Sequence, residues 1–187
     1  AIGDQLEAKL LAARIPCQLV KRQGIFDQED VKKIIQISVE ELNGKGPLIV
    51  GCPAMGTLES IEKCKEAEDL GADAILAFNP KYKGMTPYSS AELLDHFMAL
   101  TDAVGIEIVP YSQLDDPIPY DIIKQLVDNN KISYMKYGVH DCELLKKILK
   151  NLGDKLFVFV GADTKTLRHL LLGAKGISTA TTAIFPK

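Results

Sequence analysis

Short apolar runs recur along the chain and constrain its fold more than any other feature of the sequence. Seven such runs, rich in β-branched and aliphatic residues, lie at 17–21, 47–52, 72–78, 105–111, 131–137, 156–161 and 176–180. Several are nearly continuous rather than alternating, which is typical of strands buried on both faces of a parallel sheet. The sequence therefore predicts an α/β protein built on such a sheet.

Segments with helical periodicity separate these runs. In the clearest segment, 27–42, an apolar face is formed by Val31, Ile35 and Leu42, as in a helix packed on a sheet. Further helices are expected at 3–14, 57–70, 89–103, 119–129, 141–152 and 164–172. Because no Ser- or Pro-rich linker interrupts the series, we expect residues 1–187 to form a single domain.

Local signals mark the ends of several predicted helices. Ser89 and Glu92 have the spacing of a capping box, in which each side chain satisfies a backbone donor at the other position. Gly71, Gly153 and Gly173 each follow a leucine where a helix should end. A left-handed C-cap favours glycine, so we expect all three glycines to adopt that conformation.

Repeated strand-helix units allow two architectures, an open doubly wound sheet or a closed barrel. A dinucleotide-binding sheet favours a GxGxxG turn and a nucleotide-binding loop has the form GxxxxGK[ST], but the sequence contains neither pattern. The stretch CPAMGT at 52–57 is interpreted as an ordinary turn between a strand and a helix. Periodicity alone leaves the choice open.

The charge pattern argues against nucleic-acid and membrane proteins. The formal net charge of -3 comes from interspersed acidic and basic residues, without the basic stripe that follows phosphates. No apolar run approaches the roughly 20 residues that cross a bilayer, and the first residues, AIGDQLEAKL, do not resemble a secretory signal. We therefore expect neither a nucleic-acid partner nor a membrane.

The four cysteines are isolated in the sequence. Cys17, Cys52, Cys64 and Cys142 form no CxxC pair and have no histidine at metal-ligand spacing. Free thiols of a cytoplasmic protein are the expected state. Cys64 falls among the apolar positions of a predicted helix, so we interpret it as a core residue.

Three residues with reactive side chains lie at or just after predicted strand ends. Lys136 closes one strand, Tyr111 closes the strand before it, and Tyr82 follows the strand at 72–78. In parallel α/β folds, reactive groups gather at the carboxyl ends of the strands. A lysine among apolar and aromatic residues loses hydration, which lowers its pKa and favours the neutral, nucleophilic amine. A neighbouring phenol can relay protons.

Structural roles remain the alternative for each of these residues. A lysine is usually a solvated surface charge, and a tyrosine at a strand end is commonly a packing residue. His96 and His169 lie within helical patterns and are interpreted as surface residues or as core residues with hydrogen-bond partners. We interpret Asp141 as an N-cap, and Asp115 and Asp116 as turn residues rather than metal ligands.

Four fragments, in the correct order, resemble the dihydrodipicolinate synthase and N-acetylneuraminate lyase family. They are LGADAILAFNPKYKGMTPYSSAELLDHF at 70–97, IEIVPYS at 106–112, ISYMKYGVHD at 132–141, and VGAD at 160–163 followed by LLLGAKGISTATTAIFPK. Each fragment alone is a weak signal. Their order and spacing together make the resemblance specific.

This resemblance implies a (β/α)8 TIM barrel that forms a lysine Schiff base with pyruvate or a related 2-keto acid. Lys136 would be the Schiff-base lysine and Tyr111 the tyrosine that relays protons. Tyr82 would be lent across a subunit interface, and Gly161 and Ser178 would line the keto-acid pocket. No metal or organic cofactor is implied, because the iminium is itself the electron sink. The resemblance also implies a homo-oligomer, specifically a tetramer.

The chain departs from the family pattern at several positions. Arg22 and Gln23, in KRQGIF, replace two threonines that relay protons and hold the substrate carboxylate. The loop SQLDDP at 112–117 lacks the arginine that often binds the second substrate in the synthases. Tyr137 follows the lysine where Asp or Glu is common. These departures argue against dihydrodipicolinate synthesis itself.

Aligned with the family, the chain would begin within the first barrel helix and end just after the eighth strand. We therefore expect an incomplete barrel, truncated at both ends, without its first strand and its C-terminal helices. Such a sheet has two unpaired edges, which normally must be covered or paired.

The preferred hypothesis is a Schiff-base-forming lyase or aldolase that acts on a small 2-keto acid through Lys136. One alternative is a catalytically impaired barrel that still binds a keto acid, which the replaced threonines favour. Another is an aldolase or dehydratase that acts on a sugar-derived 2-keto-3-deoxy acid, since one fold supports several chemistries.

Overall fold

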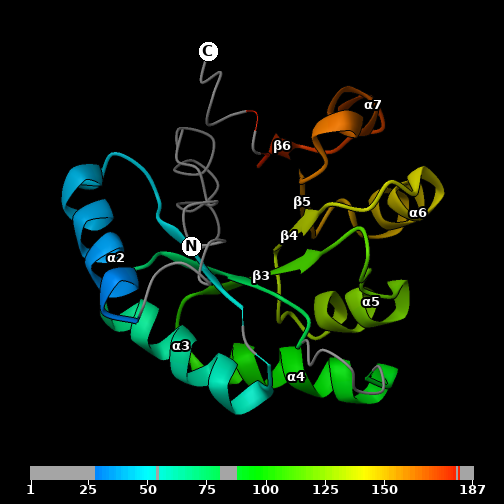
Figure 1. The fold of residues 1–187 in the computed structure, drawn as a ribbon. Coiled ribbons are helices and arrows are strands. Elements are labelled where there is room, and N and C mark those ends of the chain that lie inside the picture. The colour runs from blue at the N-terminus through cyan, green and yellow to red at the C-terminus, as the bar shows by residue number, and fades with distance from the viewer. Residues whose placement is uncertain (1–27, 54, 81–87, 180, 182–187) are drawn as a thin grey trace.

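The structure is a computed structural model that describes residues 28–53, 55–80, 88–179 and 181 (Figure 1). In this part of the chain, six strands form one parallel sheet whose spatial order follows the sequence, β1-β2-β3-β4-β5-β6. The strands are β1 (Ile49–Cys52), β2 (Ala74–Ala77), β3 (Glu107–Ser112), β4 (Tyr134–Tyr137), β5 (Phe157–Val160) and β6 (Gly176–Ile177). Each lies within an apolar run that the sequence analysis assigned to a strand, except that β3 extends one residue beyond its predicted run, to Ser112.

Helices connect the strands and lie along the outer side of the sheet. They are α2 (Gln28–Leu42), α3 (Thr57–Asp69), α4 (Ser90–Ala103), α5 (Tyr120–Asp128), α6 (Cys142–Leu152) and α7 (Thr166–Leu171), the last preceded by a 3-10 turn, η2 (Asp163–Lys165). Figure 1 shows that these helices form an arc around the curled sheet. The described residues thus form part of a barrel-like α/β fold. The predicted strand 17–21 and helix 3–14 lie outside them.

The two faces of the sheet have different neighbours. Alternate strand residues join the helices in the larger core: Ile75, Ala77, Ile108, Met135, Tyr137 and Val158. The residues between them form a smaller cluster on the inner side of the curve: Ala74, Leu76, Phe78, Val109, Tyr111 and Tyr134. Because successive side chains of a strand point to opposite faces, the side chain of Lys136 lies on the inner face with Tyr134.

Most of the helix caps predicted from the sequence are present in the structure. Ser89 and Glu92 form a capping box at the start of α4, and the Asp141 side chain accepts hydrogen bonds from two backbone amides at the start of α6. Gly71 and Gly173 have φ angles of 97° and 112°, as predicted. The prediction for Gly153 is wrong, because its φ of -64° is right-handed. Its N–H bonds to the Leu149 carbonyl, so the helical turn continues through it.

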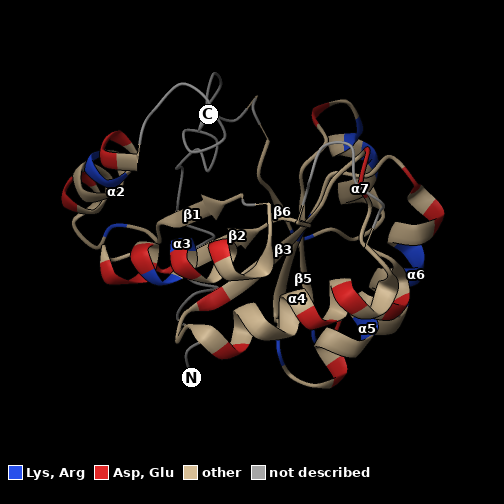
Figure 2. Cartoon of the chain, turned by 60° about the horizontal axis from the view of Figure 1, so that its bottom comes forward, with Lys and Arg blue, Asp and Glu red and all other residues tan. Residues whose placement is uncertain are grey.

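Charged residues lie mainly on the helices (Figure 2). None of the helices in the described part of the chain is both long and apolar enough to cross a membrane.

Candidate active site

The β4 strand carries Lys136 into a buried environment. Its sequence, YMKY, places Met135 and Tyr137 toward the helices and leaves Tyr134 and Lys136 on the inner face. The Lys136 residue is only 3% exposed. A lysine is rarely buried to this extent without a specific partner or function. The burial predicted for Lys136 is therefore confirmed, and the alternative of a solvated surface charge is wrong for this residue.

Tyr111 lies directly beside Lys136. The two residues are paired in register between the parallel strands β3 and β4. The Lys136 Nζ atom lies 4.7 Å from the centroid of the Tyr111 ring. On its other side, the ring meets Phe78 edge to face, with 5.6 Å between the ring centroids. The structure thus brings together the amine and the phenol that the sequence placed on consecutive strand ends.

The Tyr111 hydroxyl is held in its protonated form. Burial raises the pKa of Tyr111, and the negative charges of Asp115 and Asp163 raise it further. A phenol in this environment remains a proton donor at neutral pH. The side chain can therefore supply a proton to a group that forms beside the amine.

Gly161, at the end of β5, lies against both side chains. A Cβ atom at this position would be 2.9 Å from Lys136 Cε and 3.2 Å from Tyr111 Cε2. Ser178 follows β6, where its backbone N–H donates to the Val160 carbonyl at 2.8 Å. Its part in a keto-acid pocket stays a prediction. Tyr82, Arg22 and Gln23 lie outside the described residues.

The loop after β3 contains a tight turn, as predicted. The Asp116 N–H donates to the Gln113 carbonyl at 3.3 Å, and the Asn79 side-chain amide donates to the Asp116 carbonyl at 3.1 Å. The loop is thereby tied to the end of β2. It carries the exposed Asp115 close enough to influence the Tyr111 phenol.

Asp163 is a residue of this region that the sequence analysis did not single out. Its carboxylate accepts hydrogen bonds from the backbone N–H and the hydroxyl of Thr181, which joins the start of η2 to the segment after β6. Its charge also acts on Tyr111. The available signal was an acidic residue two positions after the predicted strand end at Gly161, where functional residues of parallel α/β proteins gather.

The two buried histidines differ in their contacts. His96 has hydrogen-bonding contacts with the Thr57 hydroxyl and the Phe78 carbonyl, so it is a core residue with partners, as predicted. His169 is fully buried against the Tyr137 ring, and neither of its ring nitrogens has a hydrogen-bond partner within the described residues. The prediction is therefore wrong for His169. Burial lowers the pKa of both imidazoles, which favours their neutral forms.

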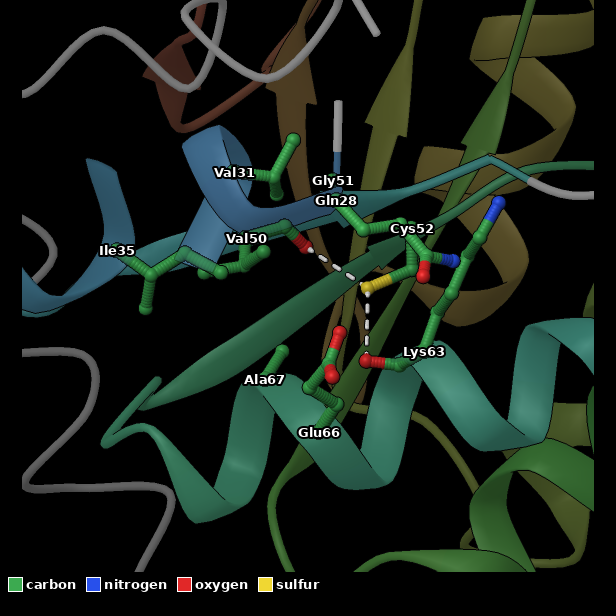
Figure 3. A pocket seen from close by; sticks show the side chains of 9 residues that line it. All are labelled: Gln28, Val31, Ile35, Val50, Gly51, Cys52, Lys63, Glu66 and Ala67. Atoms are coloured by element: carbon green, nitrogen blue, oxygen red, sulfur yellow. Dashed lines mark hydrogen bonds between the residues drawn. The ribbon is translucent and has the colours of Figure 1, made fainter. Parts of the chain in front are cut away.

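A cavity of about 160 Å³ lies away from Lys136, between α2, β1 and α3 (Figure 3). It is lined by Gln28, Val31, Ile35, Val50, Gly51, Cys52, Lys63, Glu66 and Ala67. Lys136, Tyr111 and Gly161 do not line it. Its charged groups are already paired, because Lys63 bonds to Glu59 and Glu66 bonds to Lys32. We therefore assign the chemistry to the inner face of the sheet and not to this cavity.

The described cysteines are free and buried, as predicted, and Cys64 is a core residue. Contact with the Cys64 thiol, followed by burial, raises the pKa of Cys52. A thiol that stays protonated is a poor nucleophile and a poor metal ligand. Cys52 therefore has no reactive character, although it lines the cavity.

Comparisons with known proteins agree with the fold and with the sequence fragments. The model described as the Dihydrodipicolinate synthetase family matches residues 24–187. A 4-hydroxy-tetrahydrodipicolinate synthase from Thermodesulfovibrio yellowstonii is 31% identical over 176 residues, which are 92% of this chain and 60% of the relative. Another from Clostridium perfringens is 32% identical over 178 residues, or 94% of this chain and 60% of that protein.

A solved structure is similar over the same region. The chloride-inhibited dihydrodipicolinate synthase from Acinetobacter baumannii, complexed with pyruvate, superposes with a TM-score of 0.83 and 28% sequence identity. The match covers 91% of this chain and 59% of that chain. The chain thus spans about 60% of the length of the curated relatives that it matches.

Proposed function

Because this chain belongs to the dihydrodipicolinate synthetase family, we propose that Lys136 forms a Schiff base with pyruvate or a related 2-keto acid. The observation that carries the proposal is the buried amine of Lys136 beside the Tyr111 ring, at the inner edge of the parallel sheet. The Acinetobacter baumannii relative with pyruvate supports the choice of keto acid.

In the first step, the neutral amine of Lys136 bonds to the ketone carbon as the carbonyl π bond breaks, and one proton passes from the nitrogen of this adduct to its oxygen, which becomes a hydroxyl. The Tyr111 phenol then donates a proton to that hydroxyl, which leaves as water. The product is an iminium ion whose nitrogen withdraws electrons from the adjacent carbons. Burial of Lys136 limits the access of bulk water, which would hydrolyse the iminium.

The iminium allows carbon-carbon or carbon-oxygen bonds to be made and broken. The Tyr111 phenolate left by the previous step accepts a proton from the carbon next to the iminium, which gives an enamine and restores the phenol. The enamine adds to a second carbonyl compound in an aldol reaction. The reverse sequence cleaves the same bond. We propose this lyase or aldolase chemistry for the protein, with Lys136 as the nucleophile and Tyr111 as the proton donor.

The loop after β3 favours a second substrate other than that of dihydrodipicolinate synthesis. Its sequence, SQLDDP at 112–117, carries the exposed carboxylate of Asp115 and lacks an arginine. The charge of Asp115 acts on the Tyr111 phenol, so it disfavours a second substrate that brings a further negative charge to that side of the site. A sugar-derived 2-keto-3-deoxy acid, whose cleavage releases an uncharged aldehyde, fits this loop better. The candidate function is an aldolase or dehydratase of that substrate class.

The decisive experiment is reduction of the imine with borohydride. The protein is incubated with pyruvate and borohydride, digested, and analysed by mass spectrometry. A reduced pyruvyl adduct at Lys136 supports the proposal, whereas a folded protein without an adduct contradicts it. Thermal stabilisation by pyruvate without an adduct would instead support the impaired keto-acid-binding barrel.

Membership of the family also supports three further proposals, on domain organisation, cellular location and assembly. We propose that the chain belongs to a single barrel domain, that the protein is cytoplasmic, and that it assembles as a homotetramer. Size-exclusion chromatography with light scattering tests the assembly.

A further inference from the structure

Two glycines lie next to Lys136 and Tyr111 on the inner face of the sheet. Gly138 is the first residue after β4, two positions beyond Lys136, and Gly161 is the first residue after β5, two positions beyond Phe159. Their amides continue the parallel hydrogen-bond ladder, from Gly138 to the Ser112 carbonyl at 2.8 Å and from Gly161 to the Tyr137 carbonyl at 2.7 Å. Both positions are therefore tied by backbone hydrogen bonds to the neighbouring strand, directly after their own strand ends.

Backbone conformation does not require glycine at either position. Among the described glycines, the left-handed φ angles that favour this residue occur at Gly44, Gly71 and Gly173. The φ angles of Gly138 and Gly161 lie outside that left-handed range. Space for neighbouring side chains is then the physical reason for glycine here.

The two glycines make room for different atoms. A Cβ atom at Gly138 would lie 2.9 Å from Tyr111 Cε2, 3.0 Å from the Tyr111 hydroxyl oxygen and 3.2 Å from the Ser112 carbonyl oxygen. A Cβ atom at Gly161 would lie 2.9 Å from Lys136 Cε and 3.1 Å from Lys136 Cγ. Gly138 thus borders the phenol, whereas Gly161 borders mainly the lysine.

A side chain at position 138 would have to displace the phenol. The backbone there is held by the hydrogen bond to Ser112, so it cannot move away without breaking the ladder. The Tyr111 ring is confined between Phe78 and Lys136, so relief of the contact requires the ring to rotate or to slide past the amine. Either movement changes the position of the phenol relative to the reacting nitrogen.

We propose that Gly138 is a positioning residue of the active site, because its missing side chain allows the Tyr111 phenol to lie beside the Lys136 amine. This inference rests on the proposed Schiff-base chemistry. Gly138 does not itself contact the reacting atoms but acts through Tyr111.

The test compares Gly138→Ala with Gly56→Ala. The control is suitable because a Cβ atom at Gly56 meets nothing within 4 Å. The measured quantity is the rate at which pyruvate and borohydride modify Lys136. We expect Gly138→Ala to slow this rate about 10- to 100-fold, as a misplaced catalytic group does, and Gly56→Ala to leave it unchanged. An unchanged rate in folded Gly138→Ala would overturn the inference.

A double-variant comparison separates positioning from a general structural effect. If Gly138 acts through the phenol, adding Gly138→Ala to Tyr111→Phe slows trapping little beyond Tyr111→Phe alone. Fully additive losses of trapping rate would contradict the inference.

If Gly138→Ala does not fold, the stability of the double variant Gly138→Ala/Tyr111→Ala is compared with that of Tyr111→Ala. If the double variant is as stable as Tyr111→Ala, the result supports a clash between a side chain at position 138 and the Tyr111 ring. If the double variant is less stable than Tyr111→Ala, the result argues against that clash.

If the proposed Schiff-base function is itself wrong, the trapping experiment gives a different result. Wild-type protein that is not modified by pyruvate and borohydride refutes the Schiff-base proposal itself. The position of the phenol is then still measured by the ultraviolet absorbance of tyrosinate during alkaline titration, with Tyr111→Phe as the blank. A shifted Tyr111 titration in Gly138→Ala supports the structural part of the inference, and an unshifted titration overturns it.

Discussion

The Lys136 Nζ atom lies 4.7 Å from the centroid of the Tyr111 ring, and the two residues are paired in register across adjacent parallel strands. Both side chains are on the inner face of the sheet, and both residues are buried. Because the strand backbones hold this pairing, the distance between amine and phenol does not depend on a flexible loop. Groups on rigid elements keep the precise geometry that catalysis requires.

Replacing the lysine should abolish trapping without unfolding the protein. Lys136→Met retains most of the length of the side chain and removes the nucleophile, so no pyruvyl adduct should form. Its unfolding free energy should stay within about 1 kcal/mol of wild type or exceed it, because an apolar side chain fits a buried site. Lys146→Met is the control, since Lys146 is half exposed and pairs with Glu143. Mass spectrometry and urea unfolding provide the measurements, and an adduct in Lys136→Met contradicts the assignment.

Removing the phenol hydroxyl should slow imine formation and preserve the fold. Tyr111→Phe keeps the ring and its edge-to-face contact with Phe78. The loss of a positioned proton donor should reduce the trapping rate about 10²- to 10⁴-fold. Single-turnover trapping, followed by mass spectrometry, measures the rate. A Tyr111→Phe protein that is trapped at the wild-type rate would show that another group donates the proton.

Tyr137 should make stability depend on pH in alkaline solution. Burial, followed by the charges of Asp141 and Cys142, raises the pKa of Tyr137 well above its usual range. The stabilising contribution of the protonated Tyr137 hydroxyl is complete below its pKa in the unfolded chain, about 10. It is lost as pH rises from there toward the higher pKa of the folded protein. Tyr137→Phe should flatten this loss. At neutral pH it should cost about 1 kcal/mol, because the hydroxyl no longer donates to the Asp141 carbonyl at 2.6 Å.

Tyr88→Phe is the matched control for this experiment. The Tyr88 hydroxyl also donates to a backbone carbonyl, that of Met55, but the residue is 41% exposed. Tyr88→Phe therefore shows the effect of removing a tyrosine hydroxyl that is not buried. Urea unfolding at a series of pH values measures the slopes. An identical alkaline slope in Tyr137→Phe and wild type would refute the assignment to Tyr137.

Protonation of His169 should lower the stability of the folded protein as pH falls. Burial lowers the pKa of the imidazole, and the nearby His140, Lys165 and Arg168 lower it further. A lowered folded pKa means that stability is complete above the unfolded pKa of about 6.5 and is lost as pH falls through the folded value. His169→Phe should reduce this loss. At neutral pH it should cost little or increase stability by about 1 kcal/mol, because the imidazole has no hydrogen-bond partner within the described residues.

Thermal unfolding between neutral and mildly acidic pH tests the role of His169. A smaller slope should remain in His169→Phe, because burial also lowers the pKa of His96. An unchanged acid slope would show that His169 takes up its proton equally in the folded and the unfolded state, which contradicts the assignment.

Much of the fold could be predicted from the sequence. The apolar runs and the helical periods located the described strands and helices, and the Ser89 and Glu92 spacing predicted the capping box that the structure contains. These features depend on residues that are close in the sequence. Gly153 shows the limit of such local signals, because the chain continues its helical turn through a glycine that could also have ended it.

The candidate site could be predicted only in part. The placement of Lys136 and Tyr111 on consecutive strand ends followed from the sequence, and the family resemblance assigned their roles. The burial of His169 without a hydrogen-bond partner among the described residues, and the contact between Asp163 and Thr181, did not follow from either source. Both depend on how segments far apart in the sequence pack together. A single helical or loop pattern cannot predict that packing.

The sequence by itself determined which residues are in strands, which edge of the sheet they reach and which face they occupy. Parallel connections bring the carboxyl ends of all strands to one edge, and alternation with a period of two assigns the face. Only the tertiary structure decided which atoms meet. The register of β4 against β3 places Gly138 beside the Tyr111 hydroxyl, and a shift by one residue would turn Lys136 toward the helices. That register results from packing across the whole sheet.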